Sequence, residues 1–331
     1  MLDSANLLQL DKYVKSLVYT KYAHAINLAL VSYNNSWSTS CGHKTISGKL
    51  QPNSLDTYYD LDSLTTVLCT LCLMKLQQDH TIAFNDKIVK YLPDFKYDDI
   101  TLLDCMNHYS LISDSLTIDF NDDKELYHAI MNIDRSSSPV YSIYNYIILG
   151  LVIEKCTGNL KCFIEDTCKS SFEMKSIKYN PEYSLRYNCC INSNGQQGIC
   201  ADHICNILHG VSGHSGAFCQ LKDLVKLALI INNEGSLKEN VVIEKDNFAL
   251  FKADSEYVCG FKKLDDHRLY LSSDSGNMLY IDLKAKLTVI VLANFNHLTK
   301  DALEQIHKSI IDKASKCYFK DSKGKFSKFR R

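Results

Sequence analysis

A serine at the start of an apolar helix is the residue best placed to do chemistry. Ser63 follows Asp60 and Asp62, whose carboxylates can accept hydrogen bonds from the free N–H groups of a first helical turn. The N-terminal end of a helix favours developing negative charge, so an acyl-transfer nucleophile would be useful at this position. The apolar residues that follow recur at helical spacing and predict a buried helix: Leu64, Val67, Leu68, Leu71, Cys72, Met74 and Leu76.

This stretch resembles the first motif of the serine β-lactamase and penicillin-binding-protein family, particularly its class C and esterase-like branch. There, Ser-x-x-Lys opens a central helix and a Lys-Tyr-Leu-Pro segment follows. Here Ser63 is present and the later segment is Lys90 to Pro93, but Thr66 stands in place of the lysine. The resemblance implies that the lysine accepts the serine proton or holds the neighbouring charge, which a threonine hydroxyl cannot do near pH 7. Loss of one member of such a unit typically lowers the rate by about 10³- to 10⁶-fold.

The second motif of the family also has a match with one member missing. Tyr141-Ser142-Ile143, followed by Leu149-Gly150, resembles the Tyr-Ser/Ala-Asn motif and its apolar helix. The resemblance implies that Tyr141 is the proton relay. Ile143 replaces the asparagine that would hydrogen-bond the lysine and the substrate amide.

The third motif is expected on an edge strand as a basic residue followed by Thr/Ser-Gly. Within 269–282 it falls on Asp274-Ser275-Gly276 or on Leu271-Ser272-Ser273, depending on the register. Neither begins with a base, and an aspartate at Asp274 would repel a developing oxyanion. The three motifs together therefore keep one nucleophile and one tyrosine and lose every expected basic group.

Two loops resemble the family without restoring a base. Residues 107–111 resemble its Thr-His-Thr-Ser-Gly-Leu loop, with Leu111 where glycine is usual. Residues 210–218 are close to a Gly-Val-Ala-Gly-His-Ala-Gly-Leu-Phe loop. His214 in this loop could act as a substitute base for Ser63, but a structural hydrogen bond is the favoured interpretation.

The predicted elements place strands at both ends of the chain and helices in the middle. Helices are predicted over 4–19, 141–158, 221–232 and after Thr299, and strands over 24–33, 36–41, 257–262, 268–272, 278–282 and 287–294. The first two strands are separated by a turn at Asn34-Asn35. This order predicts an α/β (α+β) fold of the β-lactamase/DD-peptidase type, with an antiparallel sheet built from both chain ends. We expect one domain over 1–312, with an α/β lobe from about 1–55 and 246–312, a helical lobe over about 56–245, and a basic tail over 313–331.

Composition limits the other functions of this 331-residue chain. No signal peptide or bilayer-length apolar run is visible, so a soluble, cytoplasmic protein is expected. The 14 cysteines lie in apolar stretches, as reduced core thiols do. The Cys69-x-x-Cys72 pair has no second pair at zinc-like spacing, and no metal or cofactor is expected.

These observations predict a catalytically inactive β-lactamase-like protein with a binding or structural role, whose partners are proteins or a second copy of the chain. One alternative is a divergent serine esterase or peptidase that uses Ser63, Tyr141 and His214. Another is binding of nucleic acid or an anionic membrane by Lys313 to Arg331, a segment with eight basic residues and one acid in a chain of net charge −1.

Overall fold

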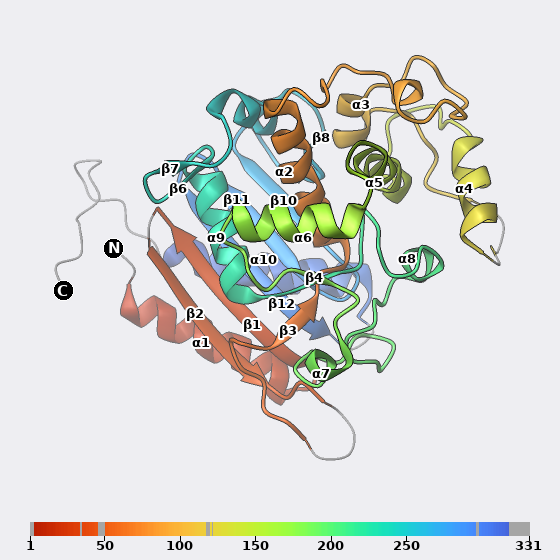
Figure 1. Cartoon of the computed structure of the whole chain (residues 1–331). Helices are drawn as coiled ribbons and strands as arrows, with labels where there is room; N and C mark the ends of the chain where they lie inside the picture. Colours follow the sequence, from red (N-terminus) through yellow and green to blue (C-terminus); the bar gives the residue numbers. More distant parts are fainter. Residues whose placement is uncertain are drawn as a thin grey trace.

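A seven-stranded antiparallel sheet forms the centre of the protein (Figure 1). The computed structural model describes residues 3–33, 35–45, 50–116, 120, 122–295 and 298–317. The strand order is β2-β1-β12-β11-β10-β9-β8, so the two ends of the chain meet where β1 pairs with β12. The strands are β1 (Ala23–Ser32), β2 (Asn35–Gly42), β8 (Tyr257–Val258), β9 (Phe261–Lys263), β10 (Arg268–Ser272), β11 (Met278–Asp282) and β12 (Leu287–Phe295).

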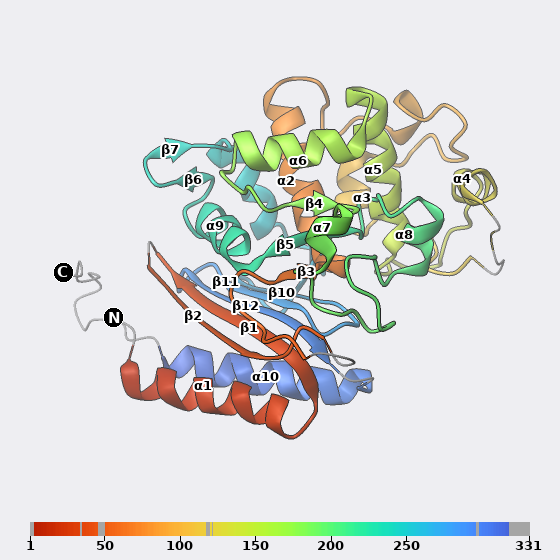
Figure 2. The same ribbon diagram turned by 60° about the horizontal axis from the view of Figure 1, so that its bottom comes forward.

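The first and last helices cover one face of this sheet (Figure 2). Helix α1 (Ser4–Tyr19) lies beside α10 (Lys300–Lys316), and each turns an apolar stripe toward the strands. Alternate residues of β1 point to opposite faces: Ile26 and Leu28 pack with these helices, whereas Ala25 and Ala29 pack with the helices on the other side. The sheet is therefore buried on both faces, which explains why β1 and β12 are apolar almost throughout.

The other face of the sheet carries the helical part of the molecule (Figure 2). Helix α2 (Thr65–Gln78) is buried over its first ten residues, 65–74, as expected for a helix that is apolar on every side. The remaining helices are α3 (Leu102–Met106), α4 (Asp123–Met131), α5 (Ile143–Thr157), α6 (Leu160–Ser170), α7 (Tyr183–Arg186), α8 (His203–Ile207) and α9 (Leu221–Asn232). Short strands join them: β3 (Tyr58–Asp60), β4 (Lys178–Tyr179) and β5 (Ala217–Gln220) in one sheet, and β6 (Ser236–Leu237) with β7 (Asn240–Val241) in another.

The predicted fold class is confirmed, with one difference in the strands. The single strand expected over 257–262 is two short strands, β8 and β9, because Cys259 and Gly260 adopt positive φ values of 51° and 83° between them. The β1–β2 hairpin is present, although Asn34 of its predicted turn lies outside the described residues. The proposed boundaries of the two lobes stay a prediction. No helix in the described part of the chain is both long and apolar enough to cross a bilayer.

Leu111 occupies a backbone conformation that suits glycine, with φ at +63°. A side chain in this left-handed region costs roughly 1–2 kcal/mol. We therefore expect Leu111→Gly to be more stable than Leu111→Ala by about 1 kcal/mol, because both variants lose the same packing and only glycine relieves the backbone. Urea unfolding of the two variants measures this difference, and equal stabilities would show that the left-handed backbone carries no cost here.

Candidate functional site

Ser63 lies in a short 3₁₀ turn, Asp62–Leu64, immediately before α2 and close to β10. Asp62, directly before it, has φ at +50°, a conformation that non-glycine residues adopt at a cost and that is common beside functional groups. The expected capping by the two aspartates is wrong, since α2 begins after Leu64 with no side-chain cap. Asp60 instead accepts the backbone N–H groups of Asp62 at 3.1 Å and of Ala201 at 2.8 Å.

Tyr141 is brought to Ser63, as the family resemblance implies, and the two side chains lie near one another. The Tyr141 ring stacks on His108, with 4.4 Å between the ring centroids. Burial raises the pKa of Tyr141 well above its ordinary value of 10, and nearby Asp62 raises it further. The phenol is therefore protonated at neutral pH and cannot take the proton of Ser63.

The residues at the positions of the family's lysine and asparagine, Thr66 and Ile143, do not supply a base. Thr66 is 1% exposed, and its hydroxyl donates to the carbonyl oxygen of Ser63 at 2.8 Å, so it bonds the backbone of its own helical turn. Ile143 begins α5, where its side chain packs against the apolar core and its N–H donates to Asp114 Oδ1 at 3.2 Å.

Both candidate positions of the third motif, residues 271–273 and 274–276, lie close to the segment that precedes Ser63. Leu271, near the end of β10, is buried in the core on the helical side of the sheet, and Asp274 is exposed in the loop to β11. Asn277 anchors this loop: its amide donates to the carbonyl oxygens of Asp60 at 2.9 Å and Leu61 at 3.3 Å.

The charge around Ser63 is acidic. Burial, together with the neighbouring Asp62 carboxylate, raises the pKa of Asp60 to about 7. Burial likewise raises the pKa of Asp62 to about 6, helped by Asp202 and Asp274. Four carboxyl groups therefore share this region, which opposes the build-up of negative charge on a reacting carbonyl.

His214 bonds residues other than Ser63. Its Nδ1 lies 2.7 Å from Ser212 Oγ and its Nε2 lies 3.0 Å from Asp202 Oδ1. Both ring nitrogens are thus occupied, and the imidazole is 3% exposed.

His108 was not among the sequence-based candidates, although it lies under Tyr141. Its Nδ1 accepts the Ser142 backbone N–H at 3.2 Å and lies 3.2 Å from the Asn145 amide nitrogen, while its buried Nε2 has no partner among the described residues. Burial lowers the pKa of His108 to about 3, so the ring is neutral. Its place in the 107–111 loop was the available signal. No group of His, Cys, Asp and Glu in the described ranges is arranged to hold a metal ion.

The fold and these motif positions define a serine β-lactamase-type domain. A family model described as Beta-lactamase matches residues 17–309, and the chain belongs to this family. A class C β-lactamase from Rhodobacter sphaeroides has the same fold, with a TM-score of 0.76 at 12% identity over 92% of this chain and 98% of that one. The octameric penicillin-binding-protein homologue from Pyrococcus abyssi gives a TM-score of 0.71 at 14% identity, covering 92% of this chain and 77% of that one.

Two curated relatives match this chain over only part of their own length. A Salmonella agona protein named for a D-alanyl-D-alanine carboxypeptidase is 25% identical over 70% of this chain, and a Bacillus subtilis N-acetylmuramyl-L-alanine amidase is 24% identical over 60% of it. The matches span 66% and 55% of those two proteins, so this chain corresponds to about two thirds of their length or less.

Proposed function

We propose that the chain has lost the serine acyl-transfer chemistry of its family at Ser63 and that the retained fold serves a binding role, with another protein as the partner. The observation that carries this proposal is the hydrogen bond from the Thr66 hydroxyl to the Ser63 carbonyl oxygen at 2.8 Å. The Thr66 hydroxyl stands where the family has a lysine, and it is neither basic nor charged. Ser63 then keeps the weak nucleophilicity of an alcohol.

The acidic surroundings support the same proposal. Acyl transfer develops negative charge on the carbonyl oxygen, and family members stabilise it with donors and a basic residue. Ionised Asp62 and Asp274 would raise the energy of that oxyanion instead. Both would also disfavour binding of any acyl donor that carries a carboxylate.

Acylation by a fluorescent penicillin tests this proposal. We expect no covalent adduct by intact-mass measurement on the full chain, even after hours at millimolar probe. Thr66→Lys alone is expected to leave the protein unlabelled, because Ile143 and the base-free third motif persist. An adduct that forms on the wild type and disappears in Ser63→Ala would overturn the proposed loss of activity.

One observation favours the divergent hydrolase as a second candidate: the side chains of Tyr141 and Ser63 still lie near one another. That candidate needs a base, and the described contacts of His214 are with Ser212 and Asp202. It predicts slow labelling of Ser63 by reactive phosphonates even where penicillins fail.

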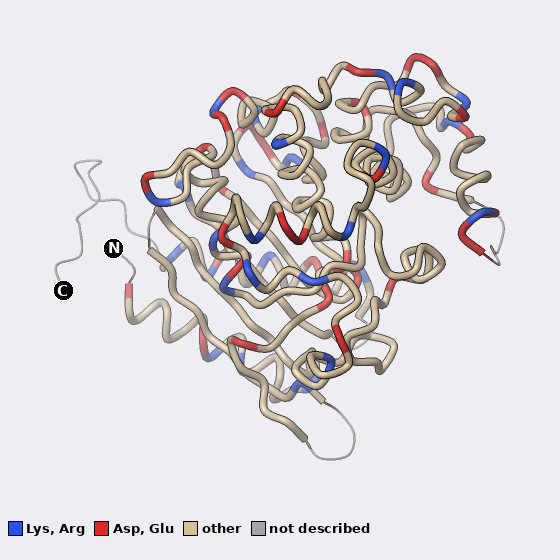
Figure 3. The backbone as a smooth tube through the Cα atoms, in the orientation of Figure 1, with Lys and Arg blue, Asp and Glu red and all other residues tan. Residues whose placement is uncertain are grey.

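Binding through the basic tail is a separate alternative. Of this segment, Lys313 and Lys316 lie in the last turn of α10, and residues 318–331 lie outside the described residues. In the view of Figure 3, acidic and basic residues are interspersed along the described chain rather than gathered in one basic stripe. Binding by the tail would therefore weaken steeply with salt and disappear on removal of 313–331.

A further inference from the structure

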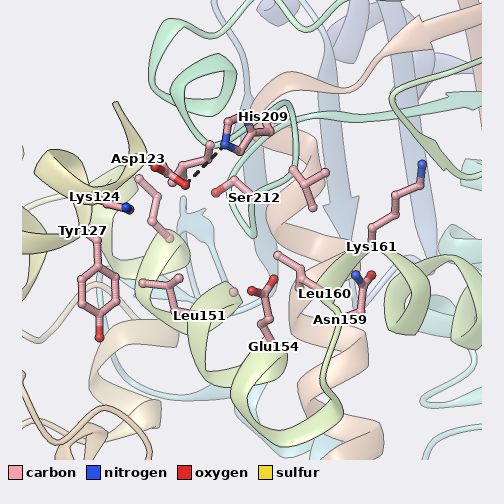
Figure 4. A pocket seen from close by; sticks show the side chains of 14 residues that line it. Asp123, Lys124, Tyr127, Leu151, Glu154, Asn159, Leu160, Lys161, His209 and Ser212 are labelled. Carbon is pink, nitrogen blue, oxygen red and sulfur yellow. Dashed lines mark hydrogen bonds and ion pairs between the residues drawn. The ribbon is translucent and has the colours of Figure 1, made fainter. Parts of the chain in front are cut away.

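A cavity of about 610 Å³ lies in the helical part of the molecule, lined by residues other than Ser63, Thr66 and Tyr141 (Figure 4). It is bounded by α4, α5, the first turn of α6 and the loop 208–212. Its apolar lining includes Tyr127, Ile147, Leu151, Leu160 and Val211. Both the volume and the apolar lining are typical of sites for small molecules.

Ser212 lies in the wall of this cavity and is the first member of a Ser-His-Asp chain. Its Oγ is 2.7 Å from His214 Nδ1, and His214 Nε2 is 3.0 Å from Asp202 Oδ1. Asp202 is well suited to orient the ring: burial alone would raise its pKa, but the hydrogen bond from His214 leaves the pKa below its usual value. An ionised Asp202 accepts the Nε2 proton, which leaves the Nδ1 lone pair to accept the proton of Ser212.

The loop that carries Ser212 is fixed against α5. A Cβ atom on Gly150 would lie 2.8 Å from the backbone nitrogen of Gly213, and one on Gly213 would lie 2.2 Å from the carbonyl oxygen of Tyr146. Two glycines are thus needed for the loop to approach the helix this closely. The hydroxyl of Tyr179 also donates to the Ser212 carbonyl oxygen at 3.0 Å. Because backbone and imidazole are both held, the Ser212 hydroxyl is placed before any ligand enters.

We propose that Ser212 is a second reactive serine, which takes the acyl group of small apolar carboxylic esters bound in this cavity. The combination of nucleophile, base and orienting carboxylate defines the reaction class. Apolar atoms make up most of the lining and favour an uncharged acyl chain, although Asp123, Lys124, Glu154 and Lys161 also line the cavity. Ser212 is only 2% exposed, so the reacting ester must be slim at its carbonyl.

The step balances with solvent water as the only further reactant. The Ser212 oxygen bonds to the carbonyl carbon while its proton moves to His214 Nδ1, and Asp202 stabilises the imidazolium that forms. The ester C–O bond breaks, and the leaving alkoxide takes the proton from Nδ1 to depart as an alcohol. A water molecule, deprotonated by the same nitrogen, then releases the carboxylic acid and restores Ser212.

The test uses the full chain in a Ser63→Ala background, which removes the family's own serine. We expect an alkyl fluorophosphonate to add to Ser212, as located by peptide mass mapping, and p-nitrophenyl acetate to be hydrolysed. Ser212→Ala should abolish both, and His214→Gln should slow both by at least about 100-fold. Ser215→Ala is the matched control: Ser215 is buried in the same loop, with its hydroxyl 3.3 Å from Cys200 Sγ, and its loss should leave both unchanged.

A cavity-filling variant separates a role in the reaction from a role in folding. Leu151→Trp places a larger side chain in the cavity, leaves Ser212, His214 and Asp202 unsubstituted, and should slow hydrolysis of p-nitrophenyl butyrate more than of the acetate. An absence of label on Ser212 in protein that unfolds cooperatively would overturn the inference. The proposed function stands or falls separately, because it concerns an adduct on Ser63 of the wild type.

Discussion

The free energy of unfolding of Asp60→Asn, minus that of the wild type, is expected to increase by about 4 kcal/mol between pH 4 and pH 8, because the wild type loses stability at Asp60 over this range. The pKa of Asp60 is raised from 3.8 to about 7 in the folded protein, chiefly by burial, and each pKa unit corresponds to about 1.4 kcal/mol. A raised pKa means that the folded state holds a proton that the unfolded chain releases. The stability that Asp60 contributes is thus fully present below pH 4 and is lost as the pH rises to about 7.

The wild type must be compared with Asp60→Asn, because two buried histidines change the stability with pH in the opposite direction to Asp60. Burial lowers the pKa of His108 to about 3 and of His307 to about 4, so both favour the folded state more as the pH rises toward 6.5. These contributions are common to the wild type and Asp60→Asn, so they cancel in the difference between the two free energies of unfolding. Urea unfolding of both proteins at pH 4, 6 and 8 measures this difference.

An exposed aspartate provides the control. Asp246→Asn should change stability by less than about 0.5 kcal/mol in the same experiment, because Asp246 is exposed. Asp62→Asn should weaken the pH dependence of the Asp60 effect, since the Asp62 carboxylate is one cause of the raised pKa of Asp60. A difference between wild type and Asp60→Asn that stays constant from pH 4 to pH 8 would contradict the acidic character assigned to this region.

Asn277→Ala is expected to destabilise the protein by about 3 kcal/mol. Asn277 is fully buried, and its amide joins three segments: it donates to the carbonyl oxygens of Asp60 and Leu61, and its Oδ1 accepts the N–H of Ala293 at 3.0 Å. Removing the amide takes the partner from the Asp60 carbonyl oxygen and from the Ala293 N–H, whereas the Leu61 carbonyl oxygen still accepts the Leu64 N–H at 3.0 Å. Each buried group left without a partner costs about 1–3 kcal/mol, which relaxation partly offsets.

Thermal unfolding of matched variants measures this effect. Asn206→Ala is the control, because Asn206 is exposed and makes a single side-chain hydrogen bond, to the Cys200 carbonyl oxygen at 2.9 Å. We expect Asn206→Ala to cost less than about 1 kcal/mol. Equal losses in the two variants would show that the β10–β11 loop is not held by Asn277.

The local elements could be predicted from the sequence because their signals are local. The spacing of Leu64, Val67, Leu68 and Leu71 indicates α2, and apolar, β-prone runs bounded by turn residues indicate the strands of the sheet. The loss of the lysine at Thr66 is also visible without coordinates, since a motif of four residues fixes the position.

The direction of individual side chains was less predictable. Asp60 and Asp62 have the right residue type and spacing for a helix cap, yet tertiary contacts place Asp60 against the backbone of Ala201 instead. Leu111 takes a left-handed backbone that its sequence opposes, because the surrounding loop determines the path of the chain.

The sequence by itself determined the fold class, the position of Ser63 at the start of a buried helix, and the absence of the family's basic residues around it. Only the tertiary structure decided which distant groups lie together: Asp60 with the backbone of Ala201, His108 with the Tyr141 ring, and His214 with Asp202 beside a cavity. The physical reason is that helix and strand periodicity depends on neighbours a few residues apart, whereas charge clusters and cavities form between segments that only packing brings together.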